Sequence, residues 1–306
     1  MILTVTLNAA LDTTYFIEGD LKPLDTHRVC AIEERAGGKG VNVARVLHQL
    51  GEDVIATGLL GGRTGAHVQS RLDADEVPTA FVGIAGESRR TTVVVAASGA
   101  TSFWEPGPAV TGSEWAGFRV RFEQLLAGAE VVVLSGSLPP GVPEAAYADL
   151  IRLARAAEVP ALLDADGDAL KFGITAGPAL LAPNAAELAE LSGQPVDGFA
   201  SAARAGRSAL AMGGQAVVAT LGTRGLVLIG PGQCLRAWTR HPVAGNPTGA
   251  GDACMAGLAR TVGRPWTERL TEAVALGAAA TAIPTAGAVD LATYQQQRLH
   301  VALEEC

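Results

Sequence analysis

One carboxylate stands in an unusual setting in the stretch GNPTGAGDACMAGLAR, residues 245–260. Asp252 directly follows Gly249, Ala250 and Gly251 and precedes an apolar run that predicts a helix. N–H groups at a helix N-terminus bind anions, and glycines let a phosphate approach them closely. A carboxylate there could take a proton from a hydroxyl that attacks this phosphate. The alternative is that Asp252 is a helix N-cap, which is the commoner role for a single aspartate.

A second glycine-rich stretch, RAGGKGVNVARVLHQLG, covers residues 35–51 and predicts another loop that opens a helix. Gly38 and Lys39 lie in this loop, and a lysine among glycines suits contact with a phosphate. An ordinary exposed lysine is the alternative. Asn42, in the first turn, could bind a ligand hydroxyl or cap the helix. The loop is not a Walker A loop, because Gly40 follows the lysine where Ser or Thr is required.

Two further stretches could hold a nucleotide and its metal. In PNAAE, Asn184 and Glu187 are three residues apart, so they share a face of a helix that begins there. Their oxygens suit Mg²⁺, but the same spacing fits a capping box equally well. The stretch ATLGTRG, residues 219–225, predicts a strand end and a tight turn, on which a phosphate or ribose could lie. It fits a simple hairpin too.

Three arginines lie among the predicted half-exposed strands. The formal net charge is −8, so a site for an anionic ligand must be local. Arg28, Arg89 and Arg90 could supply it, because arginine binds phosphate through two parallel hydrogen bonds. Surface arginines are the alternative interpretation.

The elements that must position these residues alternate short apolar runs with helical patterns. Continuous apolar runs separated by helices predict a mainly parallel sheet that is covered on both faces. Polar residues stand where the strands should end, and ligands of such sheets bind at the carboxyl ends of the strands. These residues are Ser135, Ser137, Asp164, Asn184 and Thr220.

The regions from about 13 to 35 and from about 81 to 104 have a different pattern. They alternate in two-residue steps, which predicts half-exposed antiparallel strands that form a lid, a dimer surface or both. We find no linker between domains, so the sequence predicts one domain over residues 1–306.

Composition excludes several classes of protein. The negative charge argues against a partner that is nucleic acid or an anionic membrane. The longest apolar stretch, residues 273–289, is broken by Pro284 and predicts a buried helix and a loop, not a membrane span. The four cysteines lack metal-binding spacing and predict reduced thiols. The first residues lack the features of a signal peptide, so a cytoplasmic location is expected.

Together these stretches resemble the ribokinase-like sugar kinases, in particular their phosphofructokinase B branch. The resemblance extends over nearly the whole chain and is carried by seven motifs in the same order. They are NAALD (8–12), AGGKGVN (36–42), LLGGRTG (59–65), SGSLPPG (135–141), APNAAE (182–187), TLGTRG (220–225) and NPTGAGD (246–252). The subgroup most similar to this chain contains 1-phosphofructokinases and tagatose-6-phosphate kinases. The resemblance implies a three-layer α/β/α fold with a mainly parallel central sheet and a small antiparallel β lid.

The resemblance also implies roles for individual residues. Asp252 corresponds to the general base, and Gly249, Ala250 and Gly251 to the anion hole for the transferring phosphoryl group. The implied sugar and phosphate ligands are Asp12, Arg28, Gly38, Lys39, Asn42, Arg89 and Ser137. The implied ATP ligands are Asn184, Thr220, Gly222, Thr223, Arg224, Gly225 and Gly251. Asn184 and Glu187 correspond to the motif that organises Mg²⁺ through water.

The implied reaction is phosphorylation of a ketohexose monophosphate by ATP and Mg²⁺, with fructose 1-phosphate converted to fructose 1,6-bisphosphate. A homodimer formed through the lid is implied as well. Tagatose 6-phosphate, fructose 6-phosphate and unphosphorylated sugars remain alternatives. Outside the class, a dinucleotide-dependent oxidoreductase and a non-catalytic nucleotide-binding protein remain open. One departure from the family pattern is Ala182, which stands where a lysine is usual.

Overall fold

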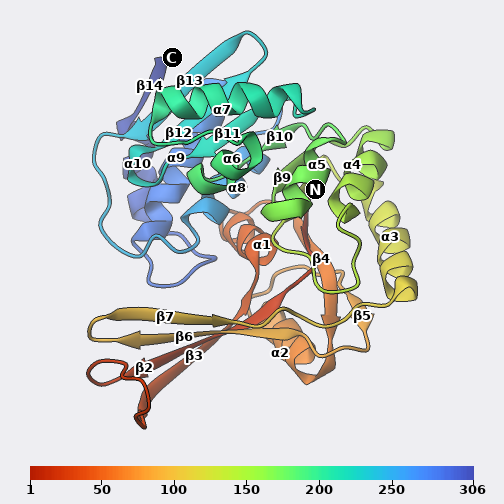
Figure 1. Ribbon diagram of the computed structural model, residues 1–306, viewed down its shortest axis with the longest axis vertical. Helices are drawn as coiled ribbons and strands as arrows, with labels where there is room; N and C mark the ends of the chain where they lie inside the picture. The colour runs from red at the N-terminus through yellow and green to blue at the C-terminus, as the bar shows by residue number, and fades with distance from the viewer.

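In the computed structural model, which describes residues 1–306, the chain is built around a ten-stranded sheet (Figure 1). Its strand order is β14-β13-β12-β11-β10-β9-β8-β1-β4-β5, and the strands from β11 to β5 run parallel. The parallel strands are β1 (Ile2–Thr6), β4 (Val54–Gly61), β5 (Val82–Ile84), β8 (Val131–Ser135), β9 (Ala161–Asp164), β10 (Leu180–Leu181) and β11 (Val217–Thr220). Central strands such as β1 and β8 are buried along their whole length, as continuous apolar runs predict.

Helices cover both faces of this sheet, so the predicted three-layer α/β/α fold is confirmed. One hydrophobic core lies under α1 (Lys39–Gln49), α2 (Gly62–Ala74), α8 (Ala250–Arg260), α9 (Trp266–Thr281) and α10 (Leu291–His300). The other lies under α3 (Gly112–Leu126), α4 (Ala146–Ala156), α5 (Gly167–Ile174), α6 (Ala185–Ser192) and α7 (Phe199–Ala211). The apolar stretch 273–289 is the buried part of α9 and the loop after it. No helix is both long enough and apolar enough to cross a membrane.

A second, four-stranded sheet projects from the body and forms the lid (Figure 1). It contains β2 (Ala10–Ile17), β3 (Val29–Gly37), β6 (Arg89–Ala96) and β7 (Gly99–Trp104) in the order β3-β2-β6-β7. The two hairpins are antiparallel as predicted, but β2 and β6 pair in parallel. Between β3 and β6 the chain passes through α1, β4, α2 and β5, and this crossover lets β2 and β6 pair in the same direction.

The predicted limits of the lid need one correction. Residues 82–84 form β5, which pairs with β4 at the edge of the large sheet and not with the lid. This strand is only three residues long, so its alternation cannot distinguish a half-exposed lid strand from an edge strand.

The sheet ends in an antiparallel extension that the sequence did not predict in full. It consists of β12 (Leu226–Gly230), β13 (Gln233–Thr239) and β14 (Val301–Glu305). Here the prediction that all thiols are reduced is wrong, because Cys234 and Cys306 form a disulfide. Pairing of β13 with β14 brings together two cysteines that are 72 residues apart in the sequence. Cys30 and Cys254 are free.

Candidate active site

Asp252 lies in the first turn of α8, but it is not the helix cap. Gly249 is the N-cap residue, and Asp252 is the third residue of the helix. Gly249 has φ 83°, and a Cβ there would lie 2.7 Å from the Cβ of Ala286, so the turn requires glycine. The N–H of Ala250 donates to the carbonyl of Pro247, whereas the N–H groups of Gly251 and Asp252 have no carbonyl partner. This turn is therefore suited to hold an anion, with the Asp252 carboxylate beside it.

The Asp252 carboxylate is buried, with 7% of the residue exposed, and has one defined partner. The side-chain amide of Asn42 donates a hydrogen bond of 2.8 Å to Asp252 Oδ2. Burial, and secondarily the charge of Asp164, raises the pKa of Asp252 to about 7. A carboxyl group with this pKa can accept a proton near neutral pH, as a general base must. Asn42, predicted as a sugar ligand, orients this carboxylate.

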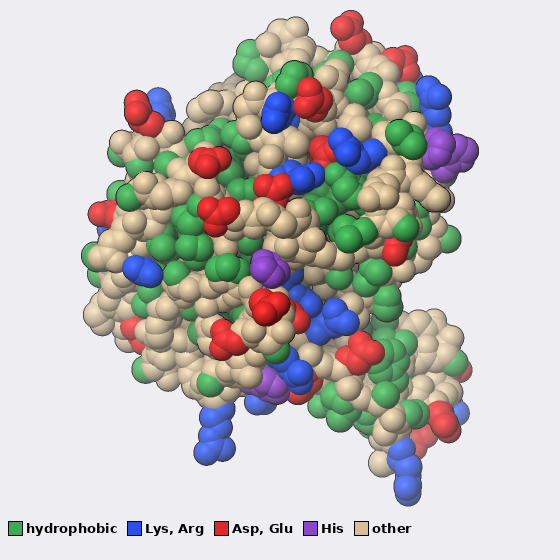
Figure 2. Space-filling view, turned by 180° about the vertical axis from the view of Figure 1, so that it is seen from behind, with side chains coloured by type: hydrophobic (Ala, Val, Ile, Leu, Met, Phe, Trp, Pro, Cys, Tyr) green, Lys and Arg blue, Asp and Glu red, His purple; other side chains and the backbone are tan.

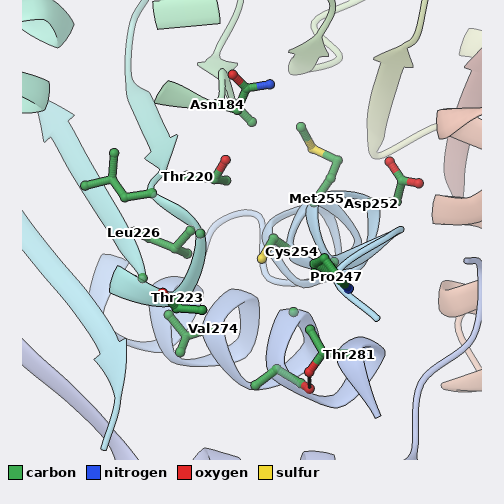
Figure 3. A pocket seen from close by; sticks show the side chains of 18 of the residues that line it. Asn184, Thr220, Thr223, Leu226, Pro247, Asp252, Cys254, Met255, Val274 and Thr281 are labelled. Atoms are coloured by element: carbon green, nitrogen blue, oxygen red, sulfur yellow. Dashed lines mark hydrogen bonds between the residues drawn. The ribbon is translucent and has the colours of Figure 1, made fainter. Parts of the chain in front are cut away.

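A cavity of about 770 Å³ lies beside Asp252 between the β11–β12 hairpin and helices α8 and α9 (Figure 3). Asp252, Cys254 and Met255 come from α8, while Val274 and Thr281 come from α9 (Figure 3). The predicted nucleotide ligands all line it. They are Asn184, Thr220, Gly222, Thr223, Arg224, Gly225 and Gly251. A cavity of this size, mostly apolar at one end and polar at the other, is large enough for a nucleotide.

The turn at residues 219–225 proves to be both a hairpin and a wall of the cavity. β11 and β12 pair in antiparallel fashion from Thr220 to Leu226, and Gly222–Arg224 form a short 3₁₀ turn between them. The Arg224 guanidinium donates a hydrogen bond to the carbonyl of Asp197. Ala182, which stands where the family usually has a lysine, also lines the cavity.

Asn184 and Glu187 form the capping box that the sequence allowed. Asn184 Oδ1 accepts hydrogen bonds from the N–H groups of Ala186 and Glu187, and Glu187 Oε2 accepts one from the N–H of Asn184. The other Glu187 oxygen faces Lys39 at 3.7 Å. Both residues line the cavity. The capping role and a position at the nucleotide site are thus compatible.

Lys39 lies beside two carboxylates in the wall of the cavity. Its ammonium is 2.8 Å from Asp164 Oδ1, and it lines the same cavity as Asp252. Burial lowers the pKa of Lys39, but the carboxylates of Asp164 and Glu187 outweigh this effect and raise it. In this structure the Lys39 ammonium faces Asp164 and Glu187, and its contact with the phosphate of a sugar stays a prediction.

The other predicted sugar ligands gather at the base of the lid. Asp12 on β2 is opposite Thr91 on β6, and burial raises the pKa of Asp12 to about 6, against the opposing effects of Thr91 and Arg89. Arg89 Nε donates to the carbonyl of Asn8, whose side-chain amide donates to Ser137 Oγ at 3.1 Å. Gly38 is the N-cap of α1 and directly precedes Lys39. Asp12, Arg89 and Ser137 thus form one cluster.

Arg28 does not join this cluster within the chain. It is exposed just before β3, at the far end of the lid from Asp12, because the lid strands run outward from Ala10 to Ile17 and back from Val29 to Gly37. Arg90, the alternative to Arg89, is exposed and follows on the opposite face of β6.

Three residues of the site were not assigned roles from the sequence. Asp164 was noted only as a polar strand end. Asn8 was noted only as the first residue of the NAALD motif, and Arg45 carried no signal that separates it from a structural residue. Arg45 on α1 pairs with Asp75 at 3.0 Å, and one of its buried nitrogens has no hydrogen-bond partner. The position of Asp164 at the carboxyl end of a central strand was the available clue.

Comparison with known proteins gives concordant matches over nearly the whole chain. The model of the pfkB family carbohydrate kinases matches residues 5–290. Phosphofructokinase-2 from Escherichia coli, in its tetrameric inhibited form, is 28% identical, with a TM-score of 0.90 over 97% of this chain and 98% of that one. A possible 1-phosphofructokinase from Thermotoga maritima is 27% identical, with a TM-score of 0.90 over 100% and 99%.

A more distant match shows the fold alone. Ribokinase from Arabidopsis thaliana, solved with ribose and ATP, is 21% identical with a TM-score of 0.77 over 97% of this chain and 98% of that one. The match over residues 5–290 also sets aside the oxidoreductase interpretation. Because this match covers nearly the whole chain, the chain belongs to the pfkB family of carbohydrate kinases.

Proposed function

We propose that this protein transfers the γ-phosphoryl group of ATP to a primary hydroxyl of a ketohexose monophosphate, with fructose 1-phosphate, phosphorylated at O6, as the preferred substrate. The observation that carries the proposal is the position of Asp252. This buried carboxylate lines the large cavity and is close enough to Asp12 for the second charge to help raise its pKa. It therefore stands where a nucleotide and a sugar would meet.

In this mechanism Asp252 accepts the proton of the sugar hydroxyl as its oxygen attacks the γ-phosphorus in line. The N–H groups at the start of α8 stabilise the charge on the transferring group. Asn42 keeps the carboxylate oriented through its hydrogen bond. Asp12 binds sugar hydroxyls, while Arg89 and Ser137 hold the phosphate already on the sugar, so that remote binding energy positions the reacting hydroxyl.

The residues around the cavity fit a magnesium ion that arrives with ATP. Mg²⁺ prefers oxygen ligands, keeps several waters and needs only one or two carboxylates besides the phosphates. Glu187 and Asp164 offer carboxylates, and Asn184 lies beside them. Bound to the phosphates, the ion would neutralise part of their charge. Glu187 and Asn184 would hold it through water.

A 6-phosphate sugar is the second candidate substrate. Phosphofructokinase-2 from Escherichia coli has been solved in complex with fructose 6-phosphate, and that structure is 30% identical, with a TM-score of 0.87 over 97% of this chain and 98% of that one. With fructose 6-phosphate or tagatose 6-phosphate, the same residues would act on the hydroxyl at O1.

The test is coupled measurement of ADP release with fructose 1-phosphate, fructose 6-phosphate, tagatose 6-phosphate and free fructose. We expect the highest kcat/KM with fructose 1-phosphate. Asp252→Asn should lower kcat by about 10²- to 10⁴-fold, since the amide cannot accept the proton. Asp168→Asn is the matched control, because Asp168 is also an acidic residue in the first turn of a helix but is exposed.

Each other outcome has a distinct meaning. A preference for a 6-phosphate would keep the mechanism and move the reacting hydroxyl to O1. Activity on free fructose alone would contradict the role of Arg89 and Ser137. Normal turnover by Asp252→Asn would remove Asp252 as the base.

We also propose that two copies of the chain associate through the lid. Four apolar side chains of its strands are exposed: Val29 by 44%, Ile32 by 60%, Phe103 by 57% and Trp104 by 75%. Figure 2 shows hydrophobic side chains gathered on this projecting sheet, at the lower right. Exposed apolar groups on an unpaired sheet favour burial against a partner. The inhibited form of Escherichia coli phosphofructokinase-2 is a tetramer, so association occurs in a similar protein.

A further inference from the structure

Asn8 contacts three segments that meet at the base of the lid. It follows β1 and is buried, with 5% of the residue exposed. The parallel pairing of β1 with β8 places Ser137, just after β8, beside it. Pro106 follows β7, and Arg89 is the first residue of β6. These partners are 81 to 129 positions away from Asn8 in the sequence, so only the folded chain brings them together.

The hydrogen bonds of the Asn8 amide fix the direction in which each hydrogen points. Asn8 Nδ2 lies 3.0 Å from the carbonyl oxygen of Pro106, which can only accept, so this end of the amide is the nitrogen. The same nitrogen lies 3.1 Å from Ser137 Oγ. Ser137 therefore accepts the hydrogen bond from Asn8. The hydrogen of the Ser137 hydroxyl has no acceptor within the protein, so it can be donated to a ligand.

Arg89 is held through the backbone of the same residue. Its Nε donates to the carbonyl oxygen of Asn8 at 3.0 Å, and its Nη1 donates to that of Glu105 at 3.2 Å. A guanidinium has five N–H groups, so these bonds leave the remaining ones for a ligand. Asn8 thus directs two neighbouring donors, Ser137 through its side chain and Arg89 through its backbone.

We propose that Asn8 is the positioning residue of the phosphate pocket formed by Arg89 and Ser137: it presents both side chains to the ligand as donors only, and so favours a phosphate over a sugar hydroxyl at this end of the substrate. This inference rests on the proposed function. The ionised oxygens of a phosphate ester only accept hydrogen bonds, and bonds to a charged acceptor are stronger than neutral ones. A hydroxyl would also need an acceptor for its own hydrogen, which these two side chains do not offer.

The other end of the amide shows that Asn8 is held there for its nitrogen. Asn8 Oδ1 is buried and has no hydrogen-bond partner. A Cβ at Gly107 would lie 2.2 Å from this oxygen, and Gly107 has φ 102°, so the glycine lets the segment after β7 close over the amide. A buried acceptor without a partner costs stability, which a side chain with a purely structural role would avoid.

Isothermal titration calorimetry without nucleotide tests the proposal in a double-mutant cycle, with fructose 1-phosphate, fructose 6-phosphate and free fructose as ligands. Asn8→Leu removes the amide, adds no charge and keeps the backbone carbonyl that holds Arg89. It should weaken binding of the sugar phosphate by about 5- to 10-fold, because the Ser137 hydroxyl is then free to turn away. Ser137→Ala should weaken it to a similar extent, and Asn8→Leu should add less than about 2-fold to that loss. Binding of free fructose should stay unchanged.

Steady-state kinetics separates positioning from a general loss of stability. In the coupled assay, Asn8→Leu should raise KM for the sugar phosphate by the same factor, with kcat and the KM for ATP close to wild type. Gln69→Leu is the matched control. The Gln69 amide also donates to a hydroxyl, that of Thr79 at 2.8 Å, and to Asp73 at 2.7 Å, but it lies on α2 outside the pocket. It should leave all three constants unchanged.

Additive losses in the cycle would overturn the proposal, as would an equal loss of free fructose binding or no binding of either sugar phosphate to wild type. Circular dichroism of each variant shows that it is folded, and Asn8→Ala gives the same comparison should Asn8→Leu unfold. The proposed function fails separately, through the absence of ADP release by wild type with every sugar phosphate. That result leaves the calorimetric cycle valid.

Discussion

Two buried carboxylates, Asp252 and Asp12, have raised pKa values for the same first reason, the loss of water around them. Their hydrogen bonds and neighbouring charges then differ. Asp252 accepts one hydrogen bond, from Asn42, and lies near the charge of Asp164, so its pKa reaches about 7. Asp12 has Thr91 and Arg89 beside it, and its pKa reaches about 6. Fewer interactions oppose the effect of burial at Asp252, so its carboxylate is the better proton acceptor, as a base requires.

The pH dependence of the reaction follows from this difference. Asp252 works as a base only when it is ionised, so kcat/KM should rise with pH and level off above about 7, the pKa of the free carboxyl. Asn42→Ala removes a hydrogen bond that favours the ionised form, so the rise should move to higher pH. Profiles of kcat/KM against pH in the coupled assay, for wild type and Asn42→Ala, measure this shift. Gln49→Ala, on the same helix, is the control, and an identical shift there would contradict the assignment.

The phosphate of the sugar gives a second test at single residues. Arg89→Ala should raise KM for the sugar phosphate by about 10- to 100-fold with a smaller change in kcat, since it removes a charged hydrogen-bond donor worth about 1.5–3 kcal/mol. KM for ATP should stay close to its wild-type value. Arg90→Ala is the matched control, because Arg90 is the neighbouring, exposed arginine on the other face of β6. Equal effects of the two changes would contradict the proposed pocket.

Among the helices and strands, α8 supplies both the proposed base, Asp252, and the N–H groups at the helix start. Its position depends on close contact with α9. A Cβ at Gly257 would lie 2.8 Å from the backbone nitrogen and 2.9 Å from the Cα of Ala273. The glycine therefore lets the two helices approach, and this fixes where Asp252 stands one turn and a half earlier. The hairpin β11–β12 supplies the opposite wall of the cavity.

Gly257→Ala should consequently lower the free energy of unfolding by about 1–3 kcal/mol, the usual cost of overpacking a core. Urea denaturation measures it. Gly117→Ala, in α3, is the comparison: nothing lies within 4 Å of the added Cβ, and the change should stabilise the helix by about 0.5–1 kcal/mol. Equal effects at both positions would show that helix propensity, and not packing, decides the result.

At the scale of the whole molecule, the lid exposes several large apolar side chains, which monomeric proteins usually bury. Ile32→Asp would place a charge on the apolar lid surface and should weaken self-association by at least about 10-fold, because an unpaired charge is costly to bury. Light scattering with size-exclusion chromatography over a concentration series measures this. Leu299→Asp is the control, since Leu299 is 83% exposed on α10 and far from the lid strands in the chain. A protein that is monomeric throughout would contradict association through the lid.

The sequence by itself determined the helices and strands and the kinds of side chain that stand at their ends. Apolar runs, glycine loops and helix starts are local patterns, so the parallel sheet, the start of α8 and the capping box at Asn184 could be predicted. It also distinguished Asp252 as an unusual carboxylate, although it left open whether that residue caps the helix.

Only the tertiary structure decided which of these residues meet. Lys39 turned out to face Asp164 and Glu187, Asn42 to hold Asp252, and Cys234 to join Cys306. Contacts between residues that are 72 to 210 positions apart depend on strand order and helix packing, which local patterns do not encode. The pKa of Asp252 likewise depends on burial and on charges from other elements, and so it exists only in the folded protein.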